Sequence, residues 1–200
     1  MKKEIAVLLT ENYADWELAF ICPELNKYRE TIHVAYVGLE DRLVTSMGGL
    51  QVASDYTAEE YLEQLMKGMK VDVLLICGGT FWAERNYEAP LAQQLVEQCV
   101  AMGSQVAAIC DAVTFLAAHA YLNGAKHTGN SLSHFIDHCS DYSGSAFFLE
   151  KQCVRDQQFI TANGTATLEF AAAIMNKLAH HSKKEIEEWY LFHKKGFYSS

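Results

Sequence analysis

Short apolar runs alternate with amphipathic segments along most of the chain. Apolar runs of strand length cover residues 3–9, 32–37, 71–77 and 105–109, and shorter ones cover 147–149, 152–154 and 159–161. Helical spacing of apolar residues marks 12–28, with a break at Pro23, and then 57–66, 90–103, 111–119 and 165–179. The run 71–77 is typical of a strand buried on both faces. This alternation predicts a doubly wound, mostly parallel α/β sheet.

Turn and capping residues predict where several of these elements begin or turn. Gly48 and Gly49 in the middle of residues 43–53 predict a small β-hairpin outside the main sheet. Thr57 and Glu60 have the spacing of a capping box at a helix start. Residues 120–145 are polar and irregular, and no helix or strand is predicted there.

The last segment, residues 182–195, is predicted to be an extra amphipathic helix. Its apolar stripe, which extends just beyond the segment, is opposite Lys and Glu and contains Ile186, Trp189, Tyr190, His193 and Phe197. This stripe is expected either to pack on its own domain or to cover a neighbouring subunit.

The length and net charge of the chain indicate how many domains it has and which partners are disfavoured. At 200 residues with half of them hydrophobic, we expect residues 1–200 to form a single domain. The formal net charge of −9 disfavours nucleic acid and anionic membrane surfaces as partners. The apolar run 5–9 is too short for a signal peptide core, and no run is long enough to span a bilayer. We therefore expect a cytoplasmic protein.

The cysteine pattern excludes two classes of small protein. No C-x-x-C pair occurs, which fits neither a disulfide framework nor a zinc ribbon. We expect reduced thiols at all six positions, which are Cys22, Cys77, Cys99, Cys110, Cys139 and Cys153.

Cys110 lies where a buried strand is expected to meet a helix. Small residues two positions before and after it, Ala108 and Ala112, would allow the sharp turn of a nucleophile elbow. A helix amino terminus beyond Cys110 would favour the reactive thiolate. The alternative is an inert cysteine packed in the core.

Two other features are candidates for the same site. The pair Gly78-Gly79 follows the preceding strand, and its backbone N–H groups could bind an anion at the carboxyl edge of the sheet. The alternative is an ordinary turn. Glu17 stands beside Trp16 and Leu18, so burial would raise its pKa and keep it protonated. The alternative is a solvated surface glutamate.

Taken in order, these motifs resemble the DJ-1/PfpI (ThiJ/PfpI) superfamily. The likeness runs through Glu17, the strand 71–77 with Gly78 and Gly79, and residues 107–110, and it includes 45–49, 115–119 and 161–165. The resemblance implies a flavodoxin-like fold, related to the class I glutamine amidotransferases, that is commonly dimeric. It also implies a Cys110 nucleophile, a protonated Glu17 that contacts the sulfur, and an oxyanion site of backbone amides near Gly79 and Asp111.

The sequence departs from this family where members with a Cys-His pair carry histidine. Those positions appear here as Asp111 and Asn130. Asp111 is then either a local general acid or base, or a helix amino-terminal residue whose carboxylate interacts favourably with the helix dipole. His127 is a candidate for a relocated histidine, with a structural role as its alternative, and Trp82 is either a pocket wall or core.

His134 and His138 are four residues apart, but two ligands do not make a metal site. We expect no metal and no cofactor.

The residues and the resemblance support two functional hypotheses. The first is a cysteine-dependent enzyme, in homodimeric form, that acts on a small carbonyl-type substrate; glyoxalase, deglycase, peptidase, isocyanide-hydrating and chaperone-like activities all occur in the family. The second is a non-enzymatic redox or stress-responsive protein whose Cys110 is oxidised. A glutaminase is disfavoured because residues 163–165 lack the late His and Glu pair that such enzymes use. A peptidase is disfavoured because Asp111 replaces the histidine that the resemblance implies for that activity.

Overall fold

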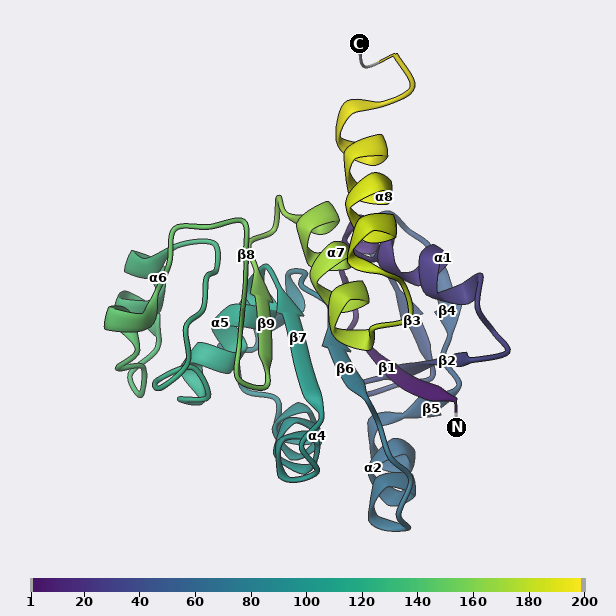
Figure 1. Cartoon of the computed structure of the whole chain (residues 1–200). Helices are drawn as coiled ribbons and strands as arrows, with labels where there is room; N and C mark the ends of the chain where they lie inside the picture. The colour runs from purple at the N-terminus through teal and green to yellow at the C-terminus, as the bar shows by residue number, and fades with distance from the viewer. Residues whose placement is uncertain (1, 199–200) are drawn as a thin grey trace.

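A seven-stranded sheet flanked by helices on both faces forms the centre of the protein (Figure 1). The computed structural model describes residues 2–198. The strand order is β5-β2-β1-β6-β7-β9-β8, and only β8 runs antiparallel to its neighbour. The strands are β1 (Lys3–Leu9), β2 (Ile32–Gly38), β5 (Tyr56–Thr57), β6 (Val73–Ile76), β7 (Gln105–Ile109), β8 (Cys153–Asp156) and β9 (Phe159–Ala162). This arrangement confirms the predicted flavodoxin-like α/β fold.

Alternation along the central strands divides the core into two layers. In β1, Ile5 and Val7 face one layer, whereas Ala6 and Leu8 face the other. One layer packs against α1 (Ile21–Asn26) and α7 (Thr167–Leu178). The other packs against α2 (Ala58–Met66), α4 (Pro90–Ala101), α5 (Asp111–Ala118) and α6 (Leu132–His138), with α3 (Phe81–Glu84) beside them. Both faces of β6 are therefore buried, as the apolar run predicted.

Several local predictions are confirmed. Strands β3 (Leu43–Thr45) and β4 (Gln51–Ala53) form the antiparallel hairpin outside the main sheet. The Thr57 hydroxyl accepts a hydrogen bond from the Glu60 N–H, and the Glu60 carboxylate accepts one from the Thr57 N–H, so the capping box forms.

Three predictions of secondary structure need correction. Residues 12–28 are not one interrupted helix, because the 3-10 helix η1 (Asp15–Leu18) precedes α1 as a separate turn. The expected strand 147–149 is wrong: the segment begins within the 3-10 helix η2 (Ser145–Phe147), and Phe148 makes only an isolated bridge to His127. Helix α6 lies inside the stretch predicted to be irregular.

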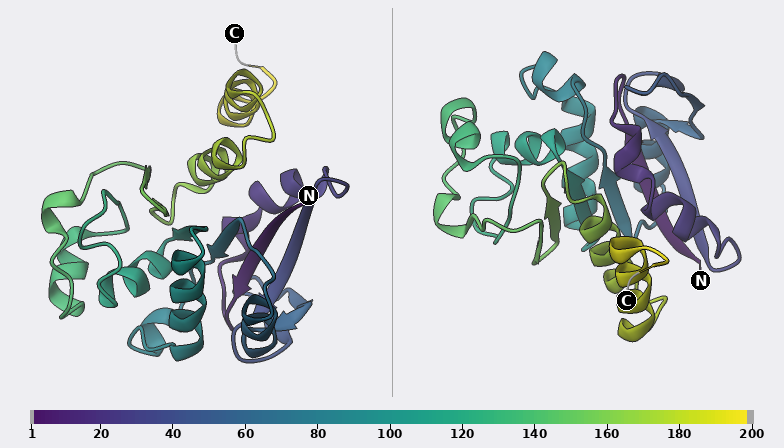
Figure 2. Two further views of the ribbon diagram at one scale, coloured as in Figure 1. Left: turned by 60° about the horizontal axis from the view of Figure 1, so that its bottom comes forward. Right: turned by 90° about the horizontal axis from the view of Figure 1, so that it is seen from above.

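The C-terminal helix α8 (Lys183–Lys195) packs partly on its own chain and partly projects away from it (Figure 2). Ile186 is buried against the α1–α7 layer, and the Trp189 indole N–H donates to the Glu24 carboxylate over 3.1 Å. Farther along, Leu191 and Phe192 remain partly exposed. None of the helices within residues 2–198 combines the length and the apolar composition that spanning a bilayer requires.

Candidate active site

Cys110 occupies a strained turn between β7 and α5. Its backbone has φ 59° and ψ −131°, a conformation that non-glycine residues rarely adopt. The Cys110 N–H donates to the Ala162 carbonyl over 3.0 Å, and its carbonyl accepts from the Val113 N–H over 3.0 Å. Ala108 and Ala112 are fully buried on either side. The turn therefore has the elbow geometry predicted from the sequence, and the Cys110 side chain is left only half-buried.

Glu17 reaches the same place from η1 and is fully buried. Its Oε2 accepts a hydrogen bond from the Gly78 N–H over 2.7 Å, and the Cys77 thiol lies 3.5 Å from that oxygen. Burial raises the pKa of Glu17 to about 7, although the hydrogen bonds from Gly78 and the two thiols oppose the shift. Of the two alternatives for Glu17, the structure shows the buried one.

Two glycines make room for the thiol and the carboxyl. A Cβ at Gly78 would lie 2.6 Å from the Cys110 Cβ and 2.8 Å from a Glu17 oxygen. A Cβ at Gly164, in the turn after β9, would lie 2.9 Å from the Cys110 sulfur. Real Cβ atoms do not approach other atoms so closely, so these positions require glycine. Gly164 lies in the family-like segment 161–165, but no local sequence signal marks it as a site residue.

Asn130 supplies the polar partner of the sulfur. Its side-chain N–H₂ lies 3.3 Å from the Cys110 Sγ and 3.4 Å from Asp111 Oδ1, while its Oδ1 accepts from the Gly164 N–H over 2.8 Å. The last bond fixes the orientation of the amide, since a carbonyl oxygen must face the N–H donor. Asn130 therefore presents a donor to the thiol, where a histidine would present a base.

Burial and nearby negative charges oppose the ionisation of the Cys110 thiol. Burial raises the pKa of the Cys110 thiol to about 11, with a further increase from the charge of Glu17, while hydrogen bonds from Asn130 and the Asp111 N–H act in the other direction. Burial also raises the pKa of Asp111, which lies in the first turn of α5. Glu17 therefore ionises first, as the pH rises through about 7, and its negative charge then opposes ionisation of Cys110.

Two predicted site residues are packed in the core of the protein. His127 is fully buried, with its ring nitrogens 2.7 Å from the Ala125 carbonyl and 2.8 Å from the Tyr142 hydroxyl. Trp82 is fully buried against Phe115 and donates to the Cys77 carbonyl over 2.9 Å. For both residues, the structural alternative describes what is observed.

Gly78 and Gly79 differ in what their backbone offers. The Gly78 N–H is already bonded to Glu17, so it is not free for a developing oxyanion. Gly79 has φ 131° and lies against residues 12 and 13, where a Cβ would come within 2.2 Å of the Asn12 carbonyl oxygen. The turn therefore holds the segment before η1, and with it Glu17, against the end of β6.

His134 is a neighbour of the site that sequence reasoning considered only for metal binding. Its Nε2 lies 2.7 Å from the hydroxyl of buried Tyr87, and a positive charge on His134 would offset part of the rise that burial causes in the pKa of Asp111. The His134 and His138 rings stack at 4.2 Å. Among residues 2–198, no group of three or more His, Cys, Asp or Glu side chains is placed to hold a metal ion.

Two cavities meet at Asn130. One, of about 390 Å³, lies between Asp111 and α6, and its wall includes His134. The other, of about 550 Å³, is lined by polar residues that include Lys151, Gln152 and Asn163. Both volumes suit a small molecule. Cys110 lines neither cavity, but Asn130, whose side-chain nitrogen approaches the Cys110 sulfur, lines both.

Comparison with known proteins identifies the family to which this chain belongs. The family model of DJ-1/PfpI matches residues 3–177. The chain belongs to the DJ-1/PfpI family. A Bacillus subtilis relative named uncharacterized protease YdeA is 34% identical over 198 residues, covering 99% of this chain and 94% of the relative. A second relative from the same organism, uncharacterized protease YoaZ, is 30% identical over 96% of this chain and 91% of its own length.

Solved structures agree with this assignment. A thiJ/pfpI family protein from Bacillus anthracis superposes with a TM-score of 0.83 at 28% identity, covering 97% of this chain and 91% of that one. Within the DJ-1/PfpI fold, this chain has an aspartate after the elbow cysteine and an amide against its sulfur. The family assignment therefore leaves the acid–base chemistry to be argued from these residues.

Proposed function

We propose that this DJ-1/PfpI protein is an enzyme that uses Cys110 to attack a small electrophilic carbonyl carbon. The observation that carries the proposal is the pairing of a half-buried cysteine on a strained elbow with the fully buried carboxyl group of Glu17. Strained backbone and perturbed titration cluster at functional sites. The two cavities beside Asn130 provide space for a small, polar substrate.

The pair can carry out an addition in which every proton is accounted for. The Cys110 proton moves to Glu17, and the thiolate attacks the carbonyl carbon, forming a C–S bond while the C=O π electrons move to oxygen. The proton then passes from Glu17 to that oxygen, which gives a thiohemiacetal. Asn130 and the Asp111 N–H favour the thiolate, and the Glu17 pKa of about 7 suits a group that takes and returns a proton near neutrality.

The same geometry argues against a cysteine–histidine peptidase. The side-chain nitrogen that approaches Sγ belongs to Asn130, and an amide does not take up a proton at neutral pH. His127 is bonded elsewhere. Because two relatives are named proteases, a peptide substrate nevertheless belongs in the activity screen.

The test is consumption of a panel of small aldehydes, α-oxoaldehydes and an unstructured peptide by three proteins: wild type, Cys110→Ser and Cys153→Ser. Cys153 is the matched control because it is also half-buried but lies in β8. We expect wild type and Cys153→Ser to consume a carbonyl compound and Cys110→Ser to be inactive with its fold intact by circular dichroism. Full activity in Cys110→Ser, or consumption of the peptide alone, would overturn the proposal.

A second candidate is redox sensing by Cys110, favoured by its partial exposure, since four of the six cysteines are buried. One peroxide molecule would convert the thiolate to a sulfenic acid and leave as water, and a second would give the sulfinic acid, which a protonated Glu17 could hydrogen-bond. Mass spectrometry after peroxide treatment should find added oxygen on Cys110 before Cys153. Equal oxidation of both cysteines would count against this function.

A further inference from the structure

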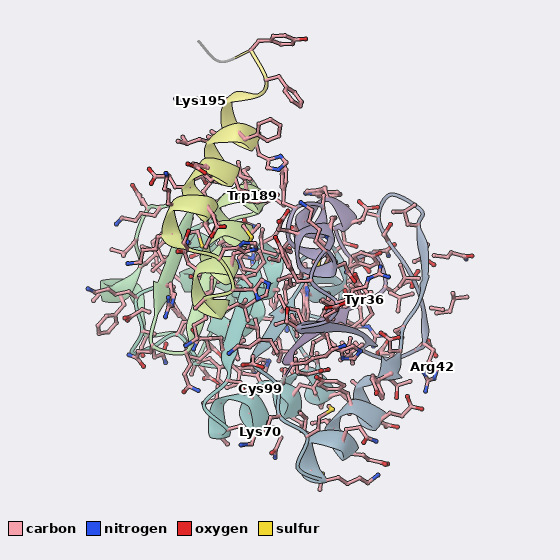
Figure 3. The ribbon with its side chains drawn as sticks, turned by 45° about the vertical axis from the view of Figure 1, so that its right-hand side comes forward. Tyr36, Arg42, Lys70, Cys99, Trp189 and Lys195 are labelled. Carbon is pink, nitrogen blue, oxygen red and sulfur yellow. The ribbon has the colours of Figure 1, made fainter. Side chains whose placement is uncertain are left out.

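A further cavity, the amino-end cleft, lies at the opposite end of the sheet from Cys110. Its volume is about 570 Å³, and it opens where β1, β6 and β7 begin, whereas Cys110 follows the end of β7. Figure 3 labels Lys70 at this end of the molecule, in the segment between α2 and β6. Ligands of open α/β sheets usually bind at the carboxyl ends of the strands, so this cleft is separate from the candidate active site.

The lining of this amino-end cleft is basic although the chain is acidic. Lys2, Lys3, Lys70 and Lys177 line it together with a single acidic residue, Asp72. These four lysines are a quarter of the 16 Lys and Arg residues in a chain of net charge −9. Charges of one sign that converge on a cavity create a local potential that attracts a ligand of the opposite sign.

Most of this positive charge is not balanced by the protein itself. Lys3 forms a 3.1 Å salt bridge with Asp72. Within residues 2–198, the side chains of Lys2, Lys70 and Lys177 form no salt bridge or hydrogen bond. Lys177 lies in the last turn of α7, where it also offsets the helix dipole. Lys2 and Lys70 are outside helices, so that role does not account for them.

The backbone beneath the lysines is held in place from several sides. The Asp72 carboxylate accepts from the Glu4 N–H over 2.9 Å, and the Asp72 carbonyl accepts from the Gln105 N–H over 3.0 Å. The buried Ser104 hydroxyl donates to the Val71 carbonyl over 2.6 Å. These bonds tie the starts of β1, β6 and β7 together. Ligand binding here would therefore require the ordering of lysine side chains and not of loops.

We propose that the amino-end cleft binds an organic phosphate that carries two or more negative charges. Lysine binds phosphate oxygens as a mobile point charge, and three uncompensated lysines suit a multiply charged group. Met102, which also lines the cleft, leaves 39% of its surface exposed and provides an apolar contact for the organic part. The volume suits a ligand the size of a nucleotide.

The test is isothermal titration calorimetry at low ionic strength with three probes: ATP, pyrophosphate and inorganic phosphate. The proteins are wild type, the double variant Lys70→Gln/Lys177→Gln, and the control Lys67→Gln, which removes an exposed lysine that is paired with Glu63 outside the cleft. Circular dichroism and thermal melting check that each variant is folded. The titrations are repeated at higher salt, because binding by exposed lysines is screened.

We expect saturable ATP binding to wild type and Lys67→Gln, weakened at least about tenfold in the double variant and weakened again by salt. Inorganic phosphate should bind much more weakly than ATP. No saturable binding of ATP up to about 1 mM would overturn the proposal. So would equal weakening by Lys67→Gln, which would indicate diffuse surface attraction. Pyrophosphate binding as tight as that of ATP would overturn the assignment of an organic part and leave an inorganic polyphosphate as the ligand.

Discussion

Replacing Glu17 with glutamine should change how the stability of the protein depends on pH. The Glu17 side chain is fully buried, and its pKa rises from 4.5 to about 7 because burial penalises the carboxylate. A raised pKa means that the folded state prefers the protonated form. The stability that this preference provides is present in full below about pH 4.5 and is lost as the pH rises through about 7.

The size of the effect follows from the shift. The rise of the Glu17 pKa from 4.5 to about 7 removes about 3 kcal/mol of stability by pH 8, and slightly under about 1 kcal/mol of that is already lost at pH 5. Glutamine is close to protonated glutamate in shape but does not ionise. Relative to wild type, Glu17→Gln should therefore gain about 2–3 kcal/mol in unfolding free energy between about pH 5 and pH 8.5. The Cys110 thiol, with a pKa of about 11, does not titrate in this range.

The assay is urea denaturation of both proteins at these two pH values. The matched control is Glu63→Gln, because Glu63 is exposed on α2. In that control, the difference from wild type should not depend on pH beyond the small change expected of a surface ion pair. A Glu17→Gln difference that is the same at both pH values would refute the argument, since it would show that Glu17 ionises as readily in the folded protein as in the unfolded chain.

Three further substitutions test the surroundings of the thiol. The charge of Asp111 raises the pKa of Cys110, so Asp111→Asn should lower that pKa below about 11 and speed alkylation by iodoacetamide at pH 8; slower alkylation would contradict this. Gly164→Ala should slow alkylation, because its Cβ would lie 2.9 Å from Sγ; Gly124→Ala, with open space at its Cβ, is the control and should alkylate at the wild-type rate. Gly78→Ala should cost about 2 kcal/mol or more in urea unfolding, because the new Cβ would overlap Cys110 and Glu17; wild-type stability would refute the close packing.

The sequence predicted those parts of the fold that depend on neighbours in the chain. The apolar run of β6, the capping box at Thr57 and the hairpin turn at Gly48 and Gly49 each carry a local signal, and each formed as expected. Helix α6 was not predicted, because Phe135 is its only buried residue and its other positions read as polar loop. The apolar segment 147–149 was misread as a strand, although Phe147 is 40% exposed.

The candidate site was predictable only in part for a similar reason. The Cys110 elbow has a local signature of small residues, which the sequence displays. The burial of Glu17 depends on Cys77 and Gly78, which lie about sixty residues away in the chain. Trp16, the neighbour that suggested an apolar environment, is 49% exposed. Similarly, the orientation of Asn130 depends on its bond to Gly164, which no local pattern indicates.

The strained backbone at Cys110 would affect the outcome of selecting this protein for higher stability. Its φ of 59° costs a residue with a side chain about 1–3 kcal/mol, and glycine would avoid most of that cost. Cys110→Gly would thus be a stabilising substitution that deletes the thiol. A library screened for melting temperature alone would favour it. Engineering of this chain for heat resistance therefore needs a thiol readout in every round, because stability and chemistry conflict at this residue.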